Sequence, residues 1–284
     1  MGSEYIHGTD AEGQRRLSRL NVLLNDTSLQ AMALRGGERI LDVGCGLGQF
    51  TRAMARVAGP DGHVLGIERD RRQISEALRL AREDGEESLL ELREGDVTQL
   101  PLSHQEWGSF DVAHARFVLE HVSDPGSVVR SMVQALRPGG RIILEDDDHD
   151  VLRLWPEPEG VIELWRAYMR QFAAMGNDPL VGRRLVSLLQ EAGAKPLRND
   201  WLFFGSCAGN HDFSAFTANF VGILVEARER MVSARLTDDE SFDAALSSFQ
   251  RWSERPDAAL WYGRCWAEGR RPATATPIRS SSTG

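Results

Sequence analysis

Short apolar runs alternate with helical patterns of apolar and polar residues over positions 39–145 of the chain. The apolar runs have the length and composition of buried strands. They cover 39–43, 63–67, 89–93, 110–115 and 141–145. The helical patterns between them cover about 48–57, 71–84 and 124–136. Strands that alternate with helices form βαβ units, so this region predicts a parallel sheet with helices on both faces.

The pattern changes on both sides of this region. Leucines at irregular but roughly helical spacing indicate a helical arm within 1–35, before the core at 36–150. Residues 151–269 predict the rest of the sheet together with helical insertions that cap its ligand-binding edge. The helices are expected at 161–175, 182–192, 212–234 and 238–252, and the strands at 201–204 and 260–267. Residues 270–284 are rich in Pro, Ser, Thr and Ala and predict a disordered tail.

Composition narrows the class of protein. The 284 residues are 42% hydrophobic and 26% charged, which is typical of a globular protein. The net charge of −9 disfavours a nucleic-acid partner. No apolar stretch approaches the roughly 18 residues of a membrane span, and the first residues do not resemble a signal peptide. Three cysteines without a CxxC pair favour a reduced, cytoplasmic setting and no zinc site.

A glycine-rich segment, Asp42-Val-Gly-Cys-Gly-Leu-Gly-Gln49, follows the first expected strand. Glycines allow the backbone to turn tightly into the next helix and to approach a ligand closely. A dinucleotide-binding loop has the spacing GxGxxG, whereas the spacing here is GxGxG. Asp42 would repel a pyrophosphate, but it could contact a ligand that carries an ammonium group. An unrelated structural turn is the alternative.

Two further acids come directly after the second and third expected strands. Glu68 lies 20 residues beyond Gly48, where a carboxylate can accept hydrogen bonds from both hydroxyls of a ribose. Asp96 is placed to accept a hydrogen bond from an adenine amino group, beside the amide of Val97. Each acid has a structural alternative: a surface acid before a helix for Glu68, and an Asx turn or helix cap for Asp96.

Together these residues resemble the motifs of class I S-adenosylmethionine-dependent methyltransferases of the UbiE-like, small-molecule type. The glycine segment resembles the first motif, Glu68 the second and Gly95-Asp96-Val97 the third. Phe110-Asp111-Val112 and the following residues to His121 resemble the fourth motif, and Leu136-Arg-Pro-Gly-Gly-Arg141 resembles the fifth. The resemblance covers residues 36–148 and is specific for the cofactor, whereas it carries no information about the acceptor.

The resemblance implies a Rossmann-like α/β fold with a seven-stranded, mostly parallel sheet. Its last strand, within 261–267, is expected to be antiparallel and inserted beside the fifth. The implied cofactor is S-adenosyl-L-methionine, with S-adenosyl-L-homocysteine as product. For Arg116 a plain ion pair is the alternative to cofactor contact. The residues expected to contact the cofactor are Asp42, Gly44, Cys45, Gly46, Gly48, Gln49, Glu68, Arg69, Gly95, Asp96, Val97, Ala115 and Arg116.

The sulfonium cofactor activates its own methyl group, so the protein mainly has to place the acceptor. A general base is needed only if the acceptor must lose a proton. Tyr5 and His7 resemble the arm that closes over the cofactor in related enzymes, and they are candidates for positioning and for the base. Their alternatives are a packing role for Tyr5 and an exposed position for His7. We expect structural roles for His114 and His121.

Residues 145–150 hold five carboxylates, and an acidic surface loop is the simplest interpretation. The functional alternative is a cationic or hydroxylated acceptor that Asp147 positions or deprotonates. Hard oxygen ligands cluster here, but no second ligand cluster accompanies them, so we predict no metal site. Aromatic residues after position 150 predict a helical core, and some of them are expected to line an apolar acceptor pocket. They are Trp155, Trp165, Tyr168, Phe172, Trp201, Phe203, Phe204, Phe216 and Phe220.

The sequence therefore predicts methyl transfer to an O, N or C atom of a small organic acceptor. It is compatible with a homodimer without requiring one. Methylation of a protein or an RNA is the first alternative; the acidic charge disfavours RNA, and no Asn/Asp-Pro-Pro-Tyr motif is present. A cofactor-binding protein without methyl transfer would carry the same glycine motif. A nicotinamide dehydrogenase is disfavoured because the third glycine is misplaced.

Overall fold

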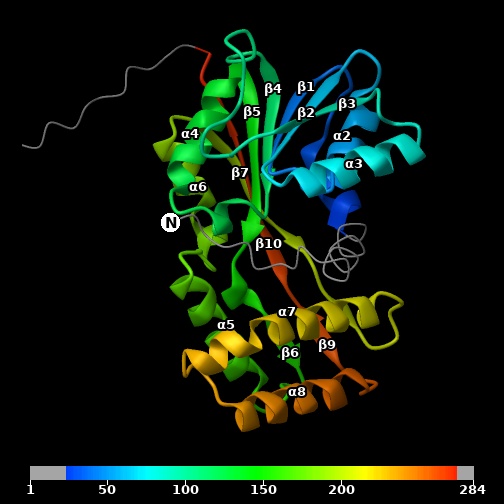
Figure 1. Cartoon of the computed structure of the whole chain (residues 1–284), viewed down its shortest axis with the longest axis vertical. Coiled ribbons are helices and arrows are strands. Elements are labelled where there is room, and N and C mark those ends of the chain that lie inside the picture. The colour runs from blue at the N-terminus through cyan, green and yellow to red at the C-terminus, as the bar shows by residue number, and fades with distance from the viewer. Residues whose placement is uncertain (1–23, 274–284) are drawn as a thin grey trace, which may run out of the picture.

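A seven-stranded sheet forms the centre of the molecule (Figure 1). The structure is a computed structural model that describes residues 24–273. The strand order is β3-β2-β1-β4-β5-β10-β7, in which neighbours among the first five are parallel and β10 is antiparallel to β5 and β7. The predicted Rossmann-like topology is thus confirmed. The strands are β1 (Arg39–Val43), β2 (His63–Glu68), β3 (Leu90–Glu94), β4 (Phe110–Arg116), β5 (Leu136–Asp147), β7 (Lys195–Phe203) and β10 (Gly263–Arg270).

Helices cover both faces of this sheet because successive side chains of a strand point to opposite faces. In β1, Ile40 packs with one cluster of buried side chains and Leu41 with another. The cluster around Ile40 includes α2 (Gln49–Ala58) and a helix over 24–32. The cluster around Leu41 includes α4 (Pro125–Ala135) and α6 (Leu185–Glu191). This two-sided burial explains the continuous apolar runs of the central strands. At the β3 side of the sheet lies α3 (Arg71–Glu83).

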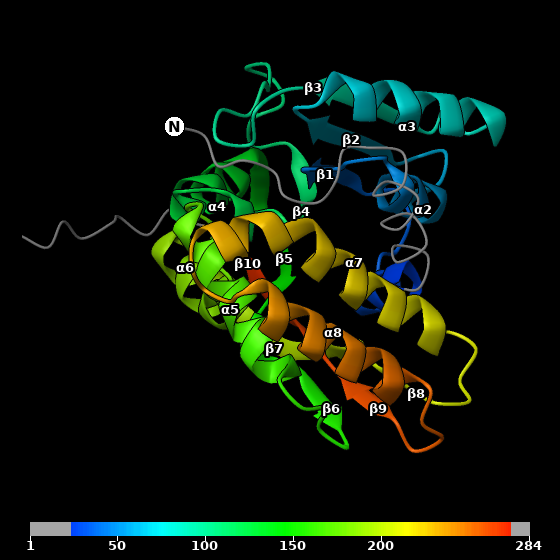
Figure 2. The same ribbon diagram turned by 60° about the horizontal axis from the view of Figure 1, so that its bottom comes forward.

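A second layer of helices lies beyond the carboxyl end of β5 (Figure 2). Its core is a separate cluster of buried side chains, rich in aromatic residues. A three-stranded sheet with the order β6-β9-β8 connects this cap to the large sheet, since β9 runs into β10. The cap consists of α5 (Val161–Ala174), α7 (Phe213–Ser233), α8 (Asp239–Ser253), β6 (Arg153–Trp155), β8 (Ser206–Cys207) and β9 (Ala259–Trp261). Within residues 24–273, no helix combines the length and apolar character of a membrane span.

The observed elements differ from the expected ones mainly where strands are short or exposed. β7 begins at Lys195, six residues before the expected strand. The sequence pattern did not show these first residues as a strand, because most of them are polar and exposed on an edge strand. The expected strand over 260–267 is divided into β9 and β10. Arg271, within the predicted tail, exchanges backbone hydrogen bonds with Gly139 and Gly140, so β10 extends the sheet further than expected. The rest of the predicted tail, from residue 274, lies outside the described residues.

An ion pair fixes the loop between β3 and β4. Arg93 donates two hydrogen bonds of 2.9 Å to the carboxylate of Glu106, which also accepts from the amide of Ser103. The hydrogen bonds from Arg93 lower the pKa of Glu106 from 4.5 to about 2. We expect Glu106→Gln to lower the free energy of unfolding by about 1–3 kcal/mol near neutral pH, because a charge-assisted pair is lost.

The pH dependence of this difference follows from the lowered pKa of Glu106. The stabilisation is complete above about pH 4.5 and is lost as the pH falls through about 2, below which Glu106 is protonated in both states. Urea denaturation of both proteins at neutral pH and at about pH 3 measures the change. Glu229→Gln, at an exposed position, is the matched control. A difference that stays constant on acidification would contradict the assignment.

Candidate active site

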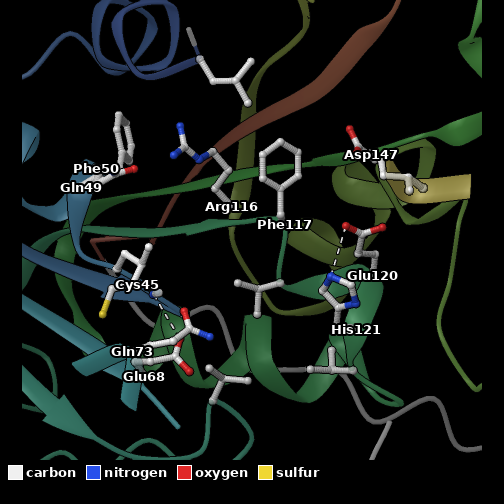
Figure 3. A pocket seen from close by; sticks show the side chains of 18 of the residues that line it. Cys45, Gln49, Phe50, Glu68, Gln73, Arg116, Phe117, Glu120, His121 and Asp147 are labelled. Atoms are coloured by element: carbon white, nitrogen blue, oxygen red, sulfur yellow. Dashed lines mark hydrogen bonds and ion pairs between the residues drawn. The ribbon is translucent and has the colours of Figure 1, made fainter. Parts of the chain in front are cut away.

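A cavity of about 520 Å³ lies between the carboxyl ends of the parallel strands and the cap (Figure 3). One end is lined by the loops after β1, β2 and β3. The other end is lined by residues of the β4 and β5 loops and by aromatic cap residues. In Figure 3, Cys45, Glu68 and Gln73 lie at the first end, and Glu120, His121 and Asp147 lie at the second. The cavity occupies the edge at which doubly wound sheets bind ligands.

Glu68 ends β2 and organises the loop after β1. Its Oε2 accepts a hydrogen bond from the amide of Gly46 at 3.1 Å, and its Oε1 accepts from the amides of Arg69 and Asp70. A carboxylate has about four acceptor positions, so one remains for a ligand while the ligand can also compete for the others. Glu68, Gly46 and Arg69, which the sequence predicts to contact the cofactor, all line the cavity.

The glycine loop reaches the cavity with left-handed backbone. Gly44 has φ of +74°, and a Cβ atom placed there would lie 2.5 Å from Cγ2 of Val118. The amides of Gly44 and Cys45 donate hydrogen bonds to the carbonyl of Ile67, which holds the loop against β2. Gly44, Cys45, Gly46 and Gln49 line the cavity. Gly48 instead caps α2 with φ of +67° and does not belong to the cavity wall.

Gly44→Ala tests this close approach. We expect a larger loss of stability than the roughly 1–3 kcal/mol of left-handed strain alone, because the methyl group overlaps Val118. Gly37→Ala is the matched control, since Gly37 has φ of +78° but no atom within 4 Å of the added Cβ. Urea denaturation compares the two variants. Equal losses of stability in both would contradict a steric role for Gly44.

Asp42 lines the cavity, but two neighbours hold its carboxylate. Its Oδ2 accepts from the hydroxyl of Thr51 at 2.6 Å, and its Oδ1 lies 2.8 Å from Nδ1 of His114. His114 is 1% exposed and is also one of the residues that line the cavity, so its expected structural role stays a prediction. Asp42 therefore contributes a fixed negative charge to the cavity wall, with fewer acceptor positions for a ligand than the sequence suggested.

The loop after β3 divides into cavity-lining and packing residues. Asp96 and Val97 line the cavity, and Oδ1 of Asp96 accepts from the amide and hydroxyl of Thr98 in an Asx turn. These bonds from Thr98 lower the pKa of Asp96. Gly95 makes room for Pro101, because a Cβ there would lie 2.4 Å from Pro101 Cγ. Ala115 is buried in the core beneath the sheet edge. Gly95 and Ala115 were both expected to contact the cofactor, but neither of them lines the cavity.

Arg116 and Phe117, at the carboxyl end of β4, project into the middle of the site in Figure 3. The guanidinium of Arg116 lies 4.3 Å from the ring centre of Phe50 and donates a hydrogen bond to Asn25 at 2.9 Å. Burial lowers the pKa of Arg116. Phe117 has φ of +55°, a strained conformation for a non-glycine residue, and its amide donates to the carbonyl of Glu145. This strained turn directs the chain from β4 into the cavity wall.

The acidic residues 145–150 have different partners, and most of them do not form a surface loop. Glu145 is fully buried against Arg264. Asp146 accepts from the amides of Val118 and Leu119, and Asp148 pairs with Arg183. Of these five acids, only Asp147 lines the cavity, and its contact with the acceptor stays a prediction. Burial raises the pKa of Asp147 well above its usual value.

Glu120 and two histidines complete this end of the cavity, and sequence reasoning missed Glu120 and His149. Nε2 of His149 lies 3.0 Å from Oε2 of Glu120, and Nε2 of His121 lies 3.4 Å from Oε1. Burial, with Asp178 as a second cause, raises the pKa of Glu120 to about 8, and burial lowers the pKa of His149. Glu120 belongs to the segment that resembles the fourth motif and comes just after a strand. This position near the sheet edge was the feature of the sequence from which a site residue could have been predicted.

Aromatic side chains of the cap cover the cavity. Trp165 and Phe220 stack with ring centres 5.1 Å apart, and Phe204 packs against Phe216 at 4.5 Å. These four aromatic residues line the cavity together with Tyr262, whereas Trp155, Trp201 and Phe203 are exposed and Tyr168 and Phe172 are buried in the cap. Gln73, Phe50 and Phe117 are further lining residues that the sequence did not single out. Tyr5 and His7 lie outside the described residues.

Comparison with protein families finds a match over residues 34–192 to a model described as a methyltransferase domain. An uncharacterised 37.1 kDa protein in transposon Tn4556 of Streptomyces fradiae is 35% identical over 169 residues, which are 58% of this chain and 46% of that protein. The 27-O-demethylrifamycin SV methyltransferase of Amycolatopsis mediterranei is 27% identical, over 90% of this chain and 86% of the relative.

Several other curated relatives are matched over only about half of their length. Among solved structures, the [4+2]-cyclase SpnF is similar with a TM-score of 0.55 and 22% identity, over 89% of this chain and 81% of that chain. At this identity the similarity shows a shared fold. It therefore adds support for the arrangement of the sheet and leaves the reaction to be argued from the site.

Proposed function

The chain belongs to the methyltransferase domain family, and on this premise we propose that it transfers a methyl group from S-adenosyl-L-methionine to an O, N or C atom of a small organic acceptor. One observation carries the proposal. A single cavity joins the edge formed by Gly44, Glu68 and Asp96 to the polar and aromatic residues beneath the cap. A nucleoside cofactor at the first end would present its methyl group to an acceptor at the second.

The lining residues fit this cofactor. Gly44 and Gly46 line the cavity without a side chain, which allows the close approach of a flat or extended ligand. The carboxylates of Glu68 and Asp96 can accept from ribose hydroxyls and from an adenine amino group. Bound S-adenosyl-L-methionine supplies an electrophilic methyl group on a sulfonium cation. The negative charge of Asp42, Glu68 and Asp96 around the cavity favours a cationic ligand.

The cap would bind the acceptor and exclude water. Trp165, Phe204 and Phe220 offer an apolar wall, and Asp147 and Glu120 offer polar groups at one side. Fixing the acceptor atom about 3–3.5 Å from the methyl carbon contributes most of the rate enhancement in such a reaction. The Amycolatopsis relative is named for methylating 27-O-demethylrifamycin SV, which supports an oxygen atom as the methyl acceptor.

The cysteines, the candidate residues of the site and the net charge also support a location and a class of partner. Cys45, Cys207 and Cys265 are unpaired, which supports a cytoplasmic location. We also propose that Tyr5 positions a ligand and that His7 acts as the general base where the acceptor must lose a proton. Asp147 is the described residue that we propose to contact the acceptor, and the acidic charge supports a small molecule over RNA as the partner.

Calorimetric titration of the full chain with S-adenosyl-L-homocysteine tests the cofactor part of this proposal. We expect saturable binding of one molecule per chain and no binding of NAD, because the loop spacing does not suit a pyrophosphate. Absence of binding at millimolar S-adenosyl-L-homocysteine, with the protein folded by circular dichroism, would refute the proposal. Because a [4+2]-cyclase shares this fold, binding must be followed by detection of a methylated product.

A further inference from the structure

Three side chains that can ligate a metal ion converge at the acceptor end of the cavity. Glu120, Asp147 and His149 each offer one ligand atom, and these atoms lie within 4.8 Å of one another. They come from separate segments: the turn after β4, the end of β5 and the turn that follows it. In Figure 3, Glu120 and Asp147 both lie on the side of the pocket away from Glu68. The cluster therefore lies apart from the expected cofactor end.

No arginine or lysine among the described residues forms an ion pair with this cluster. Within residues 24–273, the ion pairs of Glu120 involve only histidines, and no ion pair involves Asp147. In the same loop, Glu145 pairs with Arg264 and Asp148 pairs with Arg183. Two buried carboxylates without an arginine or lysine are costly unless a cation or protons compensate for them.

Unpartnered ligand atoms give a second, independent indication. Oδ1 of Asp147 is buried and has no hydrogen-bond partner in the described part of the chain. His149 is only 4% exposed, and its Nδ1 likewise has no partner there. Both residues line the cavity. Buried polar atoms are nearly always satisfied, so these two unpartnered atoms, on residues that line the cavity, point to a ligand.

We propose that Glu120, Asp147 and His149 bind one divalent cation of the Mn²⁺ or Mg²⁺ class, which holds oxygen atoms of the acceptor. Two carboxylates are hard oxygen ligands, and an imidazole favours Mn²⁺ over Mg²⁺. Three protein ligands leave about three positions of an octahedral ion for acceptor oxygens or water. The role toward the acceptor rests on the proposed function, whereas cation binding does not.

Neighbouring residues would orient these ligands. His121 lies 3.4 Å from Oε1 of Glu120, on the other side of the carboxylate from His149. The indole of Trp165 donates to the backbone carbonyl of His149 at 2.7 Å, which fixes the turn that carries the imidazole. Such second-layer contacts hold metal ligands in place. Asp146 and Asp148 are engaged elsewhere, so Asp147 is the acid of this loop that is available for a cation.

Titration of the full-length chain with Mn²⁺ alone, followed by electron paramagnetic resonance of the free ion, tests the site. We expect one Mn²⁺ per chain, displaced by excess Mg²⁺. Asp147→Asn and Glu120→Gln should each weaken Mn²⁺ binding at least about tenfold, the scale seen when a metal site is disturbed. Asp150→Asn is the matched control, because Asp150 is exposed and pairs with Arg183.

The outcomes separate this proposal from the proposed function. Asp147→Asn should keep its affinity for S-adenosyl-L-homocysteine, and Glu68→Ala should keep its affinity for Mn²⁺. No Mn²⁺ binding by the intact chain would overturn the metal site and leave cofactor binding untouched. Equal weakening by Asp150→Asn and Asp147→Asn would also overturn it, because the ion would then be bound by surface acids. Thermal unfolding of each variant verifies that the fold is retained.

Discussion

Glu68→Ala is expected to weaken binding of S-adenosyl-L-homocysteine by about 10²- to 10³-fold. Two hydrogen bonds from ribose hydroxyls to a charged carboxylate are each worth about 1.5–3 kcal/mol, and their loss is only partly additive. The substitution also removes the acceptor that holds the amides of Gly46, Arg69 and Asp70, so the loop loses its preorganisation. Isothermal titration calorimetry measures the change.

Two controls make this result specific. Glu68→Gln keeps the size and one acceptor oxygen, so it should lose less affinity than Glu68→Ala. Glu94→Gln alters the acid at the end of the neighbouring strand, which pairs with Arg71 and does not line the cavity. It should bind the ligand as the unaltered protein does. Unchanged affinity in Glu68→Ala would contradict the assignment of the nucleoside end.

The second large effect concerns stability and the buried pair Glu145–Arg264. Arg264 is 1% exposed and Glu145 is 0% exposed, and the two join β5 to the inserted strand β10. Ser28 donates to Glu145 and accepts from Arg264, so the helix over 24–32 shares the network. We expect Glu145→Leu to cost about 3–5 kcal/mol, because it leaves the guanidinium of Arg264 buried without its partner.

The second substitution Arg264→Met separates charge from packing. Replacing both partners by apolar residues of similar size is often neutral, so the double variant should recover most of the lost free energy of unfolding. Glu145 also interacts with the nearby Arg116. Burial lowers the pKa of Arg116, and the charge of Glu145 raises it by a smaller amount. Arg264→Met alone should therefore cost less than Glu145→Leu. Urea denaturation measures all three variants. Losses that simply add in the double variant would contradict an energetically coupled pair.

The nucleoside end of the site was readable from sequence because its residues are close together along the chain. Asp42, Gly44 and Gly46 follow one strand directly, and Glu68 ends the next. The parallel register, with Asp42 beside Gly66, brings these segments together without further information. The central strands were equally clear because burial on both faces gives continuous apolar runs.

The acceptor end could be predicted only in part, because its residues come from segments far apart in sequence. Pairing of Arg116 with Glu145 brings the turn of Glu120 beside Asp147, although 27 residues separate them. The sequence did not show that Glu120 lies beside Asp147, so no second group of ligands was visible and no metal site was predicted. The cap was predicted as helical, but its two- and three-residue strands are too short to show periodicity.

The most direct test of the account is detection of the transferred methyl group. A small-molecule extract incubated with the full chain and S-adenosyl-L-methionine carrying a trideuterated methyl group would be examined by mass spectrometry, with Glu68→Ala as the matched control. We predict a small acceptor that gains one trideuteriomethyl group only with the unaltered protein, together with stoichiometric S-adenosyl-L-homocysteine. Tight binding of S-adenosyl-L-homocysteine without any labelled small molecule, or label recovered only in protein or RNA, would contradict it.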